Sequence, residues 1–410
     1  MRGRLFSIAL ILALLFVIHA ETEITFAQEI VLHSFNGNNL NDGSQPFGGV
    51  AFDDAGNLYG TTFAGGTLGY GTIYKLTPGT AGWSETLLWN FNGGDGFWPK
   101  GKLTFDAEGN IYSTTWFGGF LGYGGVFELS PDGGSWTFRE LHSFNHLDKD
   151  AINPSTGLVR DSSGNFYGNA PGGGLFTWGA VYEVSSDGYG WSEKLLHSFN
   201  SSGDGSEPFG ELAIDGSGNL YGTTGYGGES TTCFGGCGTV FELSPQTGGE
   251  WTYKILHNFN NNNGANPFGG LLVDSTGNLY GMTTQGGAYN YGVVFKLSPS
   301  ASGWKETILH TFNSNGVDGN NPSGTLVQDG VGNLYGATGS GGAYSQGTVF
   351  ELSPTSQGGW KETILHSFNP NGADGTSPGS GISLDSSGNL YGTTEAGGVF
   401  GQGTVYEVMH

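Results

Sequence analysis

The 410-residue chain carries 13 Lys and Arg residues against 36 Asp and Glu residues, a formal net charge of −23 at pH 7. It has no basic stripe, which argues against nucleic acid and anionic membranes as partners. Gly (79) and Pro (14) are frequent but recur at a fixed period, so the chain is not a low-complexity sequence.

Residues 1–27 are predicted to be a secretory signal peptide. Two arginines precede the apolar run Leu5–Ile18, which is too short and wrongly flanked for a stable membrane span. Small residues follow at Ala20 and Ala27, and either can be the cleavage site. We therefore expect a secreted or cell-envelope protein that is monomeric and has no membrane span in its mature part.

Residues 28–410 consist of one repeated unit. Its signature, Asp-x-x-Gly-Asn-[Leu/Ile/Phe]-Tyr, begins at Asp53, Asp106, Asp161, Asp215, Asp274, Asp329 and Asp385. The signature tyrosines lie 53–59 residues apart, a period typical of repeat folds. Each unit contains four short apolar-alternating runs bounded by turn residues, which predict four strands. In the fifth unit these strands are expected at Gly270–Asp274, Asn278–Thr283, Val293–Ser298 and Trp304–Phe312.

The last unit lacks its fourth strand, and the N-terminus supplies a matching segment. The unit stops at Val408, whereas Glu29–Asn36 carries the missing segment before any complete unit has begun. Such a split locks a closed ring and brings no advantage to an open solenoid. Because four-stranded sheets repeated radially are propeller blades, we predict one all-β domain. It is a seven-bladed β-propeller with four-stranded blades, closed by an N-terminal strand that completes the last blade.

The repeat also resembles a known family. Gly-Asn-Leu-Tyr-Gly-Thr-Thr-x-x-Gly-Gly stands at Gly218–Gly228, is followed by Gly238–Pro245, and recurs at Gly388–Gly398. This pattern is similar to the Gloeo/Verruco (GloVer) tandem repeat of exported bacterial proteins, over essentially residues 29–410. The resemblance implies an extracellular or envelope protein without an established activity, often tethered by a C-terminal sorting signal. This chain departs from that pattern by ending at His410 without such a signal.

Residues that recur in every unit are expected to be structural. The signature Asp can accept local backbone N–H bonds in a hairpin turn. A His recurs near the end of the fourth strand, and we expect it to be hydrogen-bonded, because a catalytic group needs no equivalent copies around a ring. These histidines are His33, His142, His197, His257, His310 and His366.

The two cysteines, Cys233 and Cys237, lie in an insertion peculiar to the fourth unit. In an exported protein they are expected to form a small disulfide loop. No further Cys or clustered His completes a metal site, so none is predicted. We expect no cofactor. Calcium stays open, because links such as Asn313–Gly319 offer oxygens, although they lack an EF-hand pattern.

Ligand binding is expected where the units differ. The links from fourth to first strand and from second to third strand vary and emerge on one face, where loops on a rigid scaffold carry function. Their aromatic residues are either ligand-binding groups or packing groups. The candidates are Tyr70, Trp98, Trp116, Tyr123, Phe176, Trp178, Tyr289, Tyr291, Tyr344 and Phe400.

Two classes of function follow. The first is a non-catalytic exported scaffold that binds glycan or an envelope or extracellular protein. The second is an enzyme, such as a polysaccharide lyase, hydrolase or lactonase, that uses charged residues breaking the repeat pattern at the channel mouth. Those residues are Asp148, Asp150, Arg160, Glu207, Glu211, Glu229 and Glu395. No catalytic residue is assigned, because none can be paired with a partner from the sequence.

Overall fold

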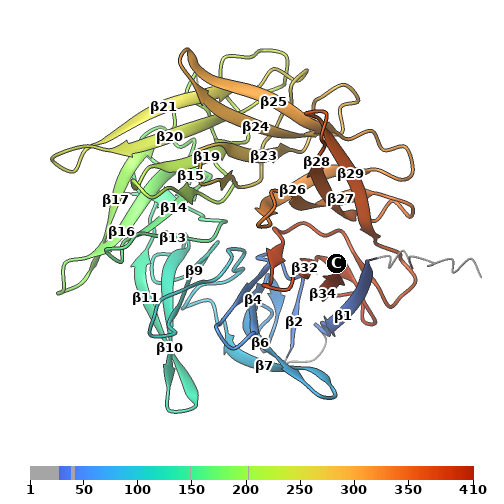
Figure 1. Ribbon diagram of the computed structural model, residues 1–410. Helices are drawn as coiled ribbons and strands as arrows, with labels where there is room; N and C mark the ends of the chain where they lie inside the picture. The colour runs from blue at the N-terminus through green and yellow to red at the C-terminus, as the bar shows by residue number, and fades with distance from the viewer. Residues whose placement is uncertain (1–26, 38–41, 148, 202) are drawn as a thin grey trace, which may run out of the picture.

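A computed structural model describes residues 27–37, 42–147, 149–201 and 203–410. Within them the strands form seven four-stranded antiparallel sheets, arranged in a ring around a central channel (Figure 1). The described residues contain no helix, and thus none that could cross a membrane. The predicted all-β, seven-bladed propeller is confirmed. The predicted signal peptide lies outside the described residues, except for Ala27.

Each blade is a meander whose first strand lies nearest the channel and whose fourth lies outermost (Figure 1). Blades 1 to 4 are β3 (Val50–Phe52), β4 (Leu58–Thr62), β6 (Thr72–Gly79) and β7 (Gly82–Asn90); β8 (Thr104–Phe105), β9 (Ile111–Thr115), β10 (Gly125–Asp132) and β11 (Ser135–Ser143); β13 (Val159–Arg160), β14 (Phe166–Ala170), β16 (Ala180–Ser186) and β17 (Trp191–Ser198); β18 (Ala213–Ile214), β19 (Leu220–Thr224), β20 (Thr239–Pro245) and β21 (Trp251–Asn258). Blades 5 to 7 are β22 (Leu272–Val273), β23 (Leu279–Thr283), β24 (Val293–Ser300) and β25 (Gly303–Thr311); β26 (Gly319–Gln328), β27 (Leu334–Gly341), β28 (Thr348–Pro354) and β29 (Trp360–Ser367); β31 (Ser383–Leu384), β32 (Leu390–Thr394), β34 (Thr404–Met409) and β1 (Gln28–Ser34).

The two variable links of each unit meet on one face of the ring. Short ladders join the link that enters a blade to the second-to-third link of that blade. They are β2 (Gly43–Ser44) with β5 (Ala64–Gly65), β12 (Ala151–Ile152) with β15 (Gly172–Gly173), and β30 (Gly375–Thr376) with β33 (Ala396–Gly397). The shared face expected for these links is therefore present.

Blade 7 is closed by the N-terminal strand, as predicted. β1 pairs antiparallel with β34, from Gln28 opposite Met409 to Ser34 opposite Thr404 (Figure 1). After this strand, the buried Phe35 packs edge-on against Tyr74 of blade 1, with ring centroids 5.0 Å apart. The chain end therefore ties blade 7 to blade 1.

The strands expected in the fifth unit agree closely with the structure, except for the first. It was predicted over Gly270–Asp274 but covers only Leu272–Val273. The preceding glycines lie against the next blade: a Cβ on Gly269 would collide with the backbone of Gly324. Close approach between blades thus shortens the strand beside the channel.

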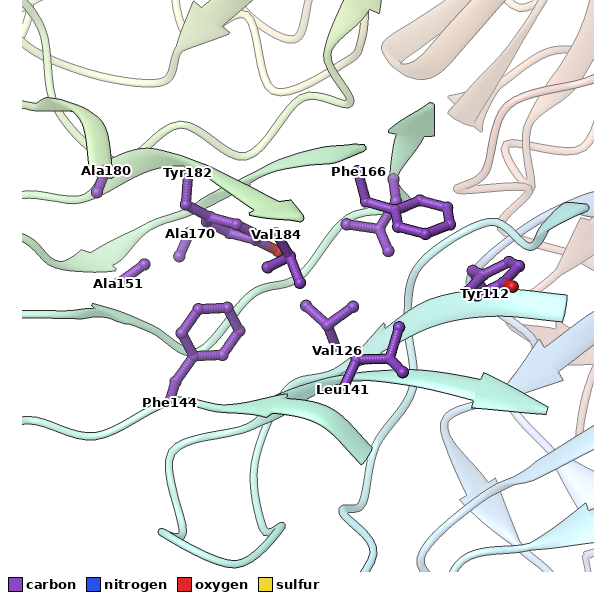
Figure 2. Packing of buried hydrophobic residues seen from close by; sticks show 11 residues of the cluster. Tyr112, Val126, Leu141, Phe144, Ala151, Phe166, Ala170, Ala180, Tyr182 and Val184 are labelled. Carbon is purple, nitrogen blue, oxygen red and sulfur yellow. The ribbon is translucent and has the colours of Figure 1, made fainter. Parts of the chain in front are cut away.

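The hydrophobic core lies between neighbouring blades. In Figure 2, Val126 and Phe144 of blade 2 face Tyr182 and Val184 of blade 3. The Phe144 and Tyr182 rings meet edge-on at 4.9 Å. The Trp that heads a fourth strand also packs across an interface, as Trp251 does on Tyr167 of the preceding blade. Each blade therefore buries its apolar faces against its neighbours, so that closing the ring completes the core.

A backbone hydrogen bond also links each blade to the next at the residue before the repeat proline. The N–H of Trp98 donates to the carbonyl of Tyr70, and that of Glu207 donates to Trp178, both at 2.9 Å. These pre-proline residues have φ values of 59° and 53°, which non-glycine residues seldom adopt. The same conformation is found at Gln45, Trp98, Asn153, Glu207, Asn266, Asn321 and Ser377. The bond therefore fixes the chain where it enters each blade.

The signature Asp is structural, as expected. Oδ1 of Asp53 accepts the N–H groups of Ala55 and Asn57, and Oδ2 accepts the Asn57 amide and the Tyr59 hydroxyl. Gly56 has a φ of 79°, which the turn requires. Burial raises the pKa of Asp53, but these hydrogen bonds outweigh burial and hold the pKa below its usual value.

This turn predicts an acid-dependent loss of stability. A carboxyl whose pKa is lowered by folding stabilises the fold above its unfolded pKa of about 4, and this contribution is lost as the pH falls below it. Asp53→Asn should therefore lower the melting temperature at pH 7, and its difference from the wild type should shrink towards pH 2. The exposed neighbour offers the matched control, Asp54→Asn, which should change little at any pH. A difference for Asp53→Asn that is constant from pH 2 to 7 would contradict the role of the charge.

Candidate functional site

A cavity lies where the blades converge on the channel. It has a volume of about 550 Å³, within the range of small-molecule sites. Its lining includes the residue that follows the repeat proline in every blade. These post-proline residues are Phe47, Lys100, Ser155, Phe209, Phe268, Ser323 and Gly379. The fold thus brings one variable side chain from each unit into a single site.

One side of the cavity is an aromatic cluster around a lysine. Nζ of Lys100 lies 3.5 Å from the ring centroid of Trp116, 4.9 Å from that of Phe63 and 5.2 Å from that of Phe47. At these distances the ammonium is held by cation–π attraction. Trp98 stacks on Phe63, with ring centroids 4.9 Å apart, and so extends the aromatic cluster.

A second aromatic group lines the cavity in blades 4 and 5. The ring centroid of Phe268 lies 5.5 Å from that of Phe209 and 5.6 Å from that of Tyr226, and both contacts are edge-on. Together with Trp116 these rings give the cavity flat apolar walls from different blades. Such walls suit a ligand that offers apolar faces.

Charged groups lie between the aromatic walls. Burial lowers the pKa of Lys100 to about 8, although the nearby Glu395 raises it. Burial raises the pKa of Glu395, which Lys100 in turn lowers, and burial also raises the pKa of Glu207. The Glu395 carboxylate lies where a Cβ on Gly379 would be, so it borders the lining. These partly desolvated groups can donate to and accept from polar groups of a ligand.

Two further charged residues, Lys102 and Glu211, line the cavity. Nζ of Lys102 donates to Oγ of Ser383 at 3.1 Å, which ties blade 2 to blade 7. Glu211 also lines the cavity and lies against Gly157 of the neighbouring blade. The site therefore combines both signs of charge with hydroxyl groups.

The ten aromatic candidates do not gather at one site. Trp116 lines the cavity and Trp98 packs beside it. Tyr123 is half-buried and packs against His146, with centroids 4.7 Å apart. The others lie in the second-to-third links outside the cavity, a surface that we call the rim, and each is at least 37% exposed. They are Tyr70, Phe176, Trp178, Tyr289, Tyr291, Tyr344 and Phe400. Packing thus accounts for Trp98 and Tyr123, whereas the rim residues are accessible.

The sequence pattern did not point to the post-proline residues or to Phe63 and Tyr226. An internal signal existed: the proline is constant, while the next residue is Phe, Lys, Ser or Gly. Of the charged candidates, Glu207 and Glu211 line the cavity and Glu395 borders it. Asp150 instead lies beside His142 at a blade interface. Asp148 is outside the described residues.

The repeat histidines are hydrogen-bonded, as expected. Nε2 of His366 lies 3.0 Å from Oδ2 of Asp374, and the other histidines have partners in the same link. In the Asn313–Gly319 link, Oδ1 of Asn315 accepts backbone N–H groups, so these oxygens are used locally. Cys233 and Cys237 form the expected disulfide.

The chain belongs to a known repeat family. The model of the Gloeobacter/Verrucomicrobia repeat matches residues 14–234 and 230–410. This match confirms the resemblance seen in the repeat signature. No curated protein matches the chain.

A solved structure shares the fold at low sequence identity. A Bacteroides uniformis protein named as a putative 6-phosphogluconolactonase superposes with a TM-score of 0.52 at 13% identity, covering 82% of this chain and 88% of its own. A Thermus thermophilus protein named as a putative oxidoreductase (glucose dehydrogenase) gives a TM-score of 0.44 at 18% identity, covering 93% and 100%. At 13% identity, the similarity to the first structure shows only a shared fold.

Proposed function

We propose that this protein is an exported, non-catalytic scaffold that binds a short neutral glycan in the cavity at the centre of the ring. The observation that carries the proposal is the convergence of every post-proline residue on that cavity. Constant residues hold the backbone there, and only the side chain differs between units. Such a site can acquire a specificity without disturbing the fold.

The chemistry of the lining favours a sugar. Sugar rings have apolar faces that stack on aromatic side chains, and Trp116 and Phe268 provide such walls. Their hydroxyl groups need donors and acceptors, which Lys100, Glu207 and Ser155 can supply. A strongly anionic ligand suits the site less well, because carboxylates share it with the lysines.

A catalytic function has one supporting observation. Glu207 and Glu211, which break the repeat pattern, line the same cavity, and Glu395 lies beside Lys100 at its border. Two carboxyl groups that flank a bound sugar are the arrangement that glycoside hydrolysis uses. Binding is the better-supported function, because the raised pKa values are explained by burial. Screens for binding should therefore include an assay for released reducing sugar.

Export rests on the N-terminal pattern. The apolar run Leu5–Ile18 after two arginines, followed by Ala20 and Ala27, is typical of a secretory signal. Ala27 stands at the position of the repeat Trp and packs against the blade 7 core, which favours cleavage at Ala20. Intact-mass measurement of protein recovered from the medium should show a chain that begins after one of these alanines. A chain that retains Met1 and stays in the cytoplasm would contradict export.

The cavity predicts which substitutions weaken binding. After a glycan array has identified a neutral oligosaccharide, Trp116→Ala and Phe268→Ala should each weaken its binding by about 1–3 kcal/mol, as for other aromatic anchors. Isothermal titration calorimetry measures the change directly. Affinity should vary little between low and moderate salt, because a neutral sugar brings no charge whose attraction to the site ions could screen.

The exposed rim offers a matched control. Trp178 is 44% exposed and does not line the cavity, so Trp178→Ala should leave the affinity unchanged. The melting temperature of each variant shows whether the fold is intact. Loss of binding in Trp178→Ala, together with full binding in Trp116→Ala and Phe268→Ala, would move the site to the rim and overturn the proposal.

A further inference from the structure

A second recurring feature lies between neighbouring blades, away from the cavity. A His from the end of one fourth strand meets an Asp from the following link and a Glu from the fourth strand of the next blade. At the interface of blades 5 and 6, Nε2 of His310 lies 3.2 Å from Oδ2 of Asp318 and 3.5 Å from Oε1 of Glu362. The side chains come from the end of one blade, the following link and the next blade, so the group forms only when blades 5 and 6 pack together.

We call these the His–Asp–Glu groups. Across residues 27–37, 42–147, 149–201 and 203–410, four complete groups occur: His33/Asp42/Glu85, His142/Asp150/Glu193, His310/Asp318/Glu362 and His366/Asp374/Glu29. In each, one ligand atom from every residue lies within 4.8 Å of the other two. The arrangement therefore recurs with one geometry at several interfaces.

The spacing suits a metal ion. Four ligands at about 2.0–2.1 Å around a tetrahedral zinc lie about 3.3 Å from one another. The His–Asp distances are 3.4 Å at His33, 3.3 Å at His142 and 3.2 Å at His310. The carboxylate of Glu85 is somewhat farther, 3.8 Å from His33. Small side-chain movements would bring all three ligands to bonding distance.

Buried oxygens in these groups lack partners. Oδ1 of Asp150 and of Asp374 has no hydrogen-bond partner within the described part of the chain, although the side chains are only 6% and 9% exposed. Oε1 of Glu85 and of Glu193 is likewise buried and has no hydrogen-bond partner among the described residues. Leaving such atoms unpaired costs free energy, so each group is suited to take up a cation or a proton.

The acidity of the glutamates agrees with this crowding. Burial raises the pKa of Glu85 to about 7 and that of Glu193 to about 8. At these pKa values a glutamate keeps a proton near neutral pH, which limits the negative charge of the two neighbouring carboxyl groups. A divalent cation would take the place of that proton and release it.

Two other interfaces show what replaces a missing ligand. Where Trp89 stands in place of His, its Nε1 donates to Oδ2 of Asp95 at 3.0 Å. Where Asn263 stands in place of Asp, its Nδ2 donates to Oε2 of Glu306 at 2.8 Å and lies 3.0 Å from Nε2 of His257. At these two interfaces a neutral side chain donates a hydrogen bond to a carboxylate. At the third incomplete interface Tyr253 stands in place of Glu, and its hydroxyl donates to the backbone carbonyl of Asp204.

We propose that the complete His–Asp–Glu groups are metal sites that bind divalent transition-metal cations, zinc being the best match, and cross-link neighbouring blades. Imidazole with carboxylates is a ligand set that zinc favours, whereas calcium prefers oxygen alone. Three protein ligands leave one position for water. The proposal departs from the earlier expectation of no metal, because the sequence alone did not show that the link Asp and the next blade's Glu reach the His.

The sites are accessible from the outer edge of the ring. The His side chains are 18–20% exposed while their Asp partners are at most 9% exposed. The group of His366, Asp374 and Glu29 also lines a cavity of about 720 Å³ between blades 6 and 7. An ion can therefore reach the imidazole without opening the blades.

Metal counting tests the proposal. Protein from residue 21 to 410, the chain expected after cleavage at Ala20, is stripped with EDTA, loaded with ZnCl₂ and passed over a chelating resin. Its zinc content is then measured by mass spectrometry of the element. We expect about four zinc ions per chain, one for each complete group. Zinc should raise the melting temperature and EDTA should lower it, since an ion that binds only the folded state stabilises it. Calcium chloride should have no such effect.

Two variants locate the bound zinc. His310→Gln should lower the count by one, because it removes one ligand of a complete group. Asn263→Asp should raise the count by one, because it completes the group formed with His257 and Glu306. No retained zinc in the wild type, or a count that neither variant changes, would overturn the proposal. If His310→Gln fails to fold, the gain in Asn263→Asp still decides the matter.

Discussion

The constraint on which the rest of this structure depends is the backbone hydrogen bond donated by the residue before each repeat proline. At the closure it runs from the N–H of Gln45 to the carbonyl of Gln402, at 2.8 Å, and its equivalents join the other neighbouring blades. It holds the donor residue in the left-handed region and the following proline in a fixed place. In every unit the residue after that proline lines the central cavity.

This constraint separates structural residues from functional ones. The signature Asp, the repeat His and the core aromatics serve every blade in the same way. Their contacts bind turns or join neighbouring blades, as Phe144 and Tyr182 do. The side chains at the post-proline position make no equivalent contact and are free to differ. A ring of nearly identical units can therefore present a single asymmetric site, in which Lys100 faces blades that carry Phe209 and Phe268.

The His–Asp–Glu groups are a second kind of contact between neighbouring blades. They lie between the outer strands, where His310 and Glu362 come from successive blades. A cation there would add to the cross-links made by the core and by the pre-proline bond. Since the ligands belong to neighbouring blades, binding would be coupled to the packing of those blades against each other.

The fold could be predicted almost completely from the sequence. The number of blades followed from the seven signatures that begin at Asp53. The closure of the ring by the N-terminal strand followed from the segment Glu29–Asn36. The main error, the length of β22, came from contacts of Gly269 with the next blade, which no local pattern reports. Periodicity describes a unit by itself, whereas blade packing depends on pairs of units.

The site was harder to predict because exposure and convergence are properties of the whole ring. The aromatic residues of the variable loops drew attention by their chemistry, and only Trp116 lines the cavity. Phe209 and Phe268 occupy the variable position after the repeat proline, outside the loops whose aromatic residues were singled out. The link Asp beside each His was missed for a similar reason: His142 and Asp150 are eight residues apart in the sequence, and the third partner comes from another blade.

The central claim is that the variable post-proline residues form the ligand site. A crystal structure of the protein in complex with the neutral oligosaccharide that binds it most tightly tests this claim most directly. We expect electron density for the sugar in the central cavity, stacked on Trp116 or Phe268 and within hydrogen-bonding distance of Lys100 or Glu395. Density on the opposite face, beside the turns at Asp53 or Asp215, would contradict the account.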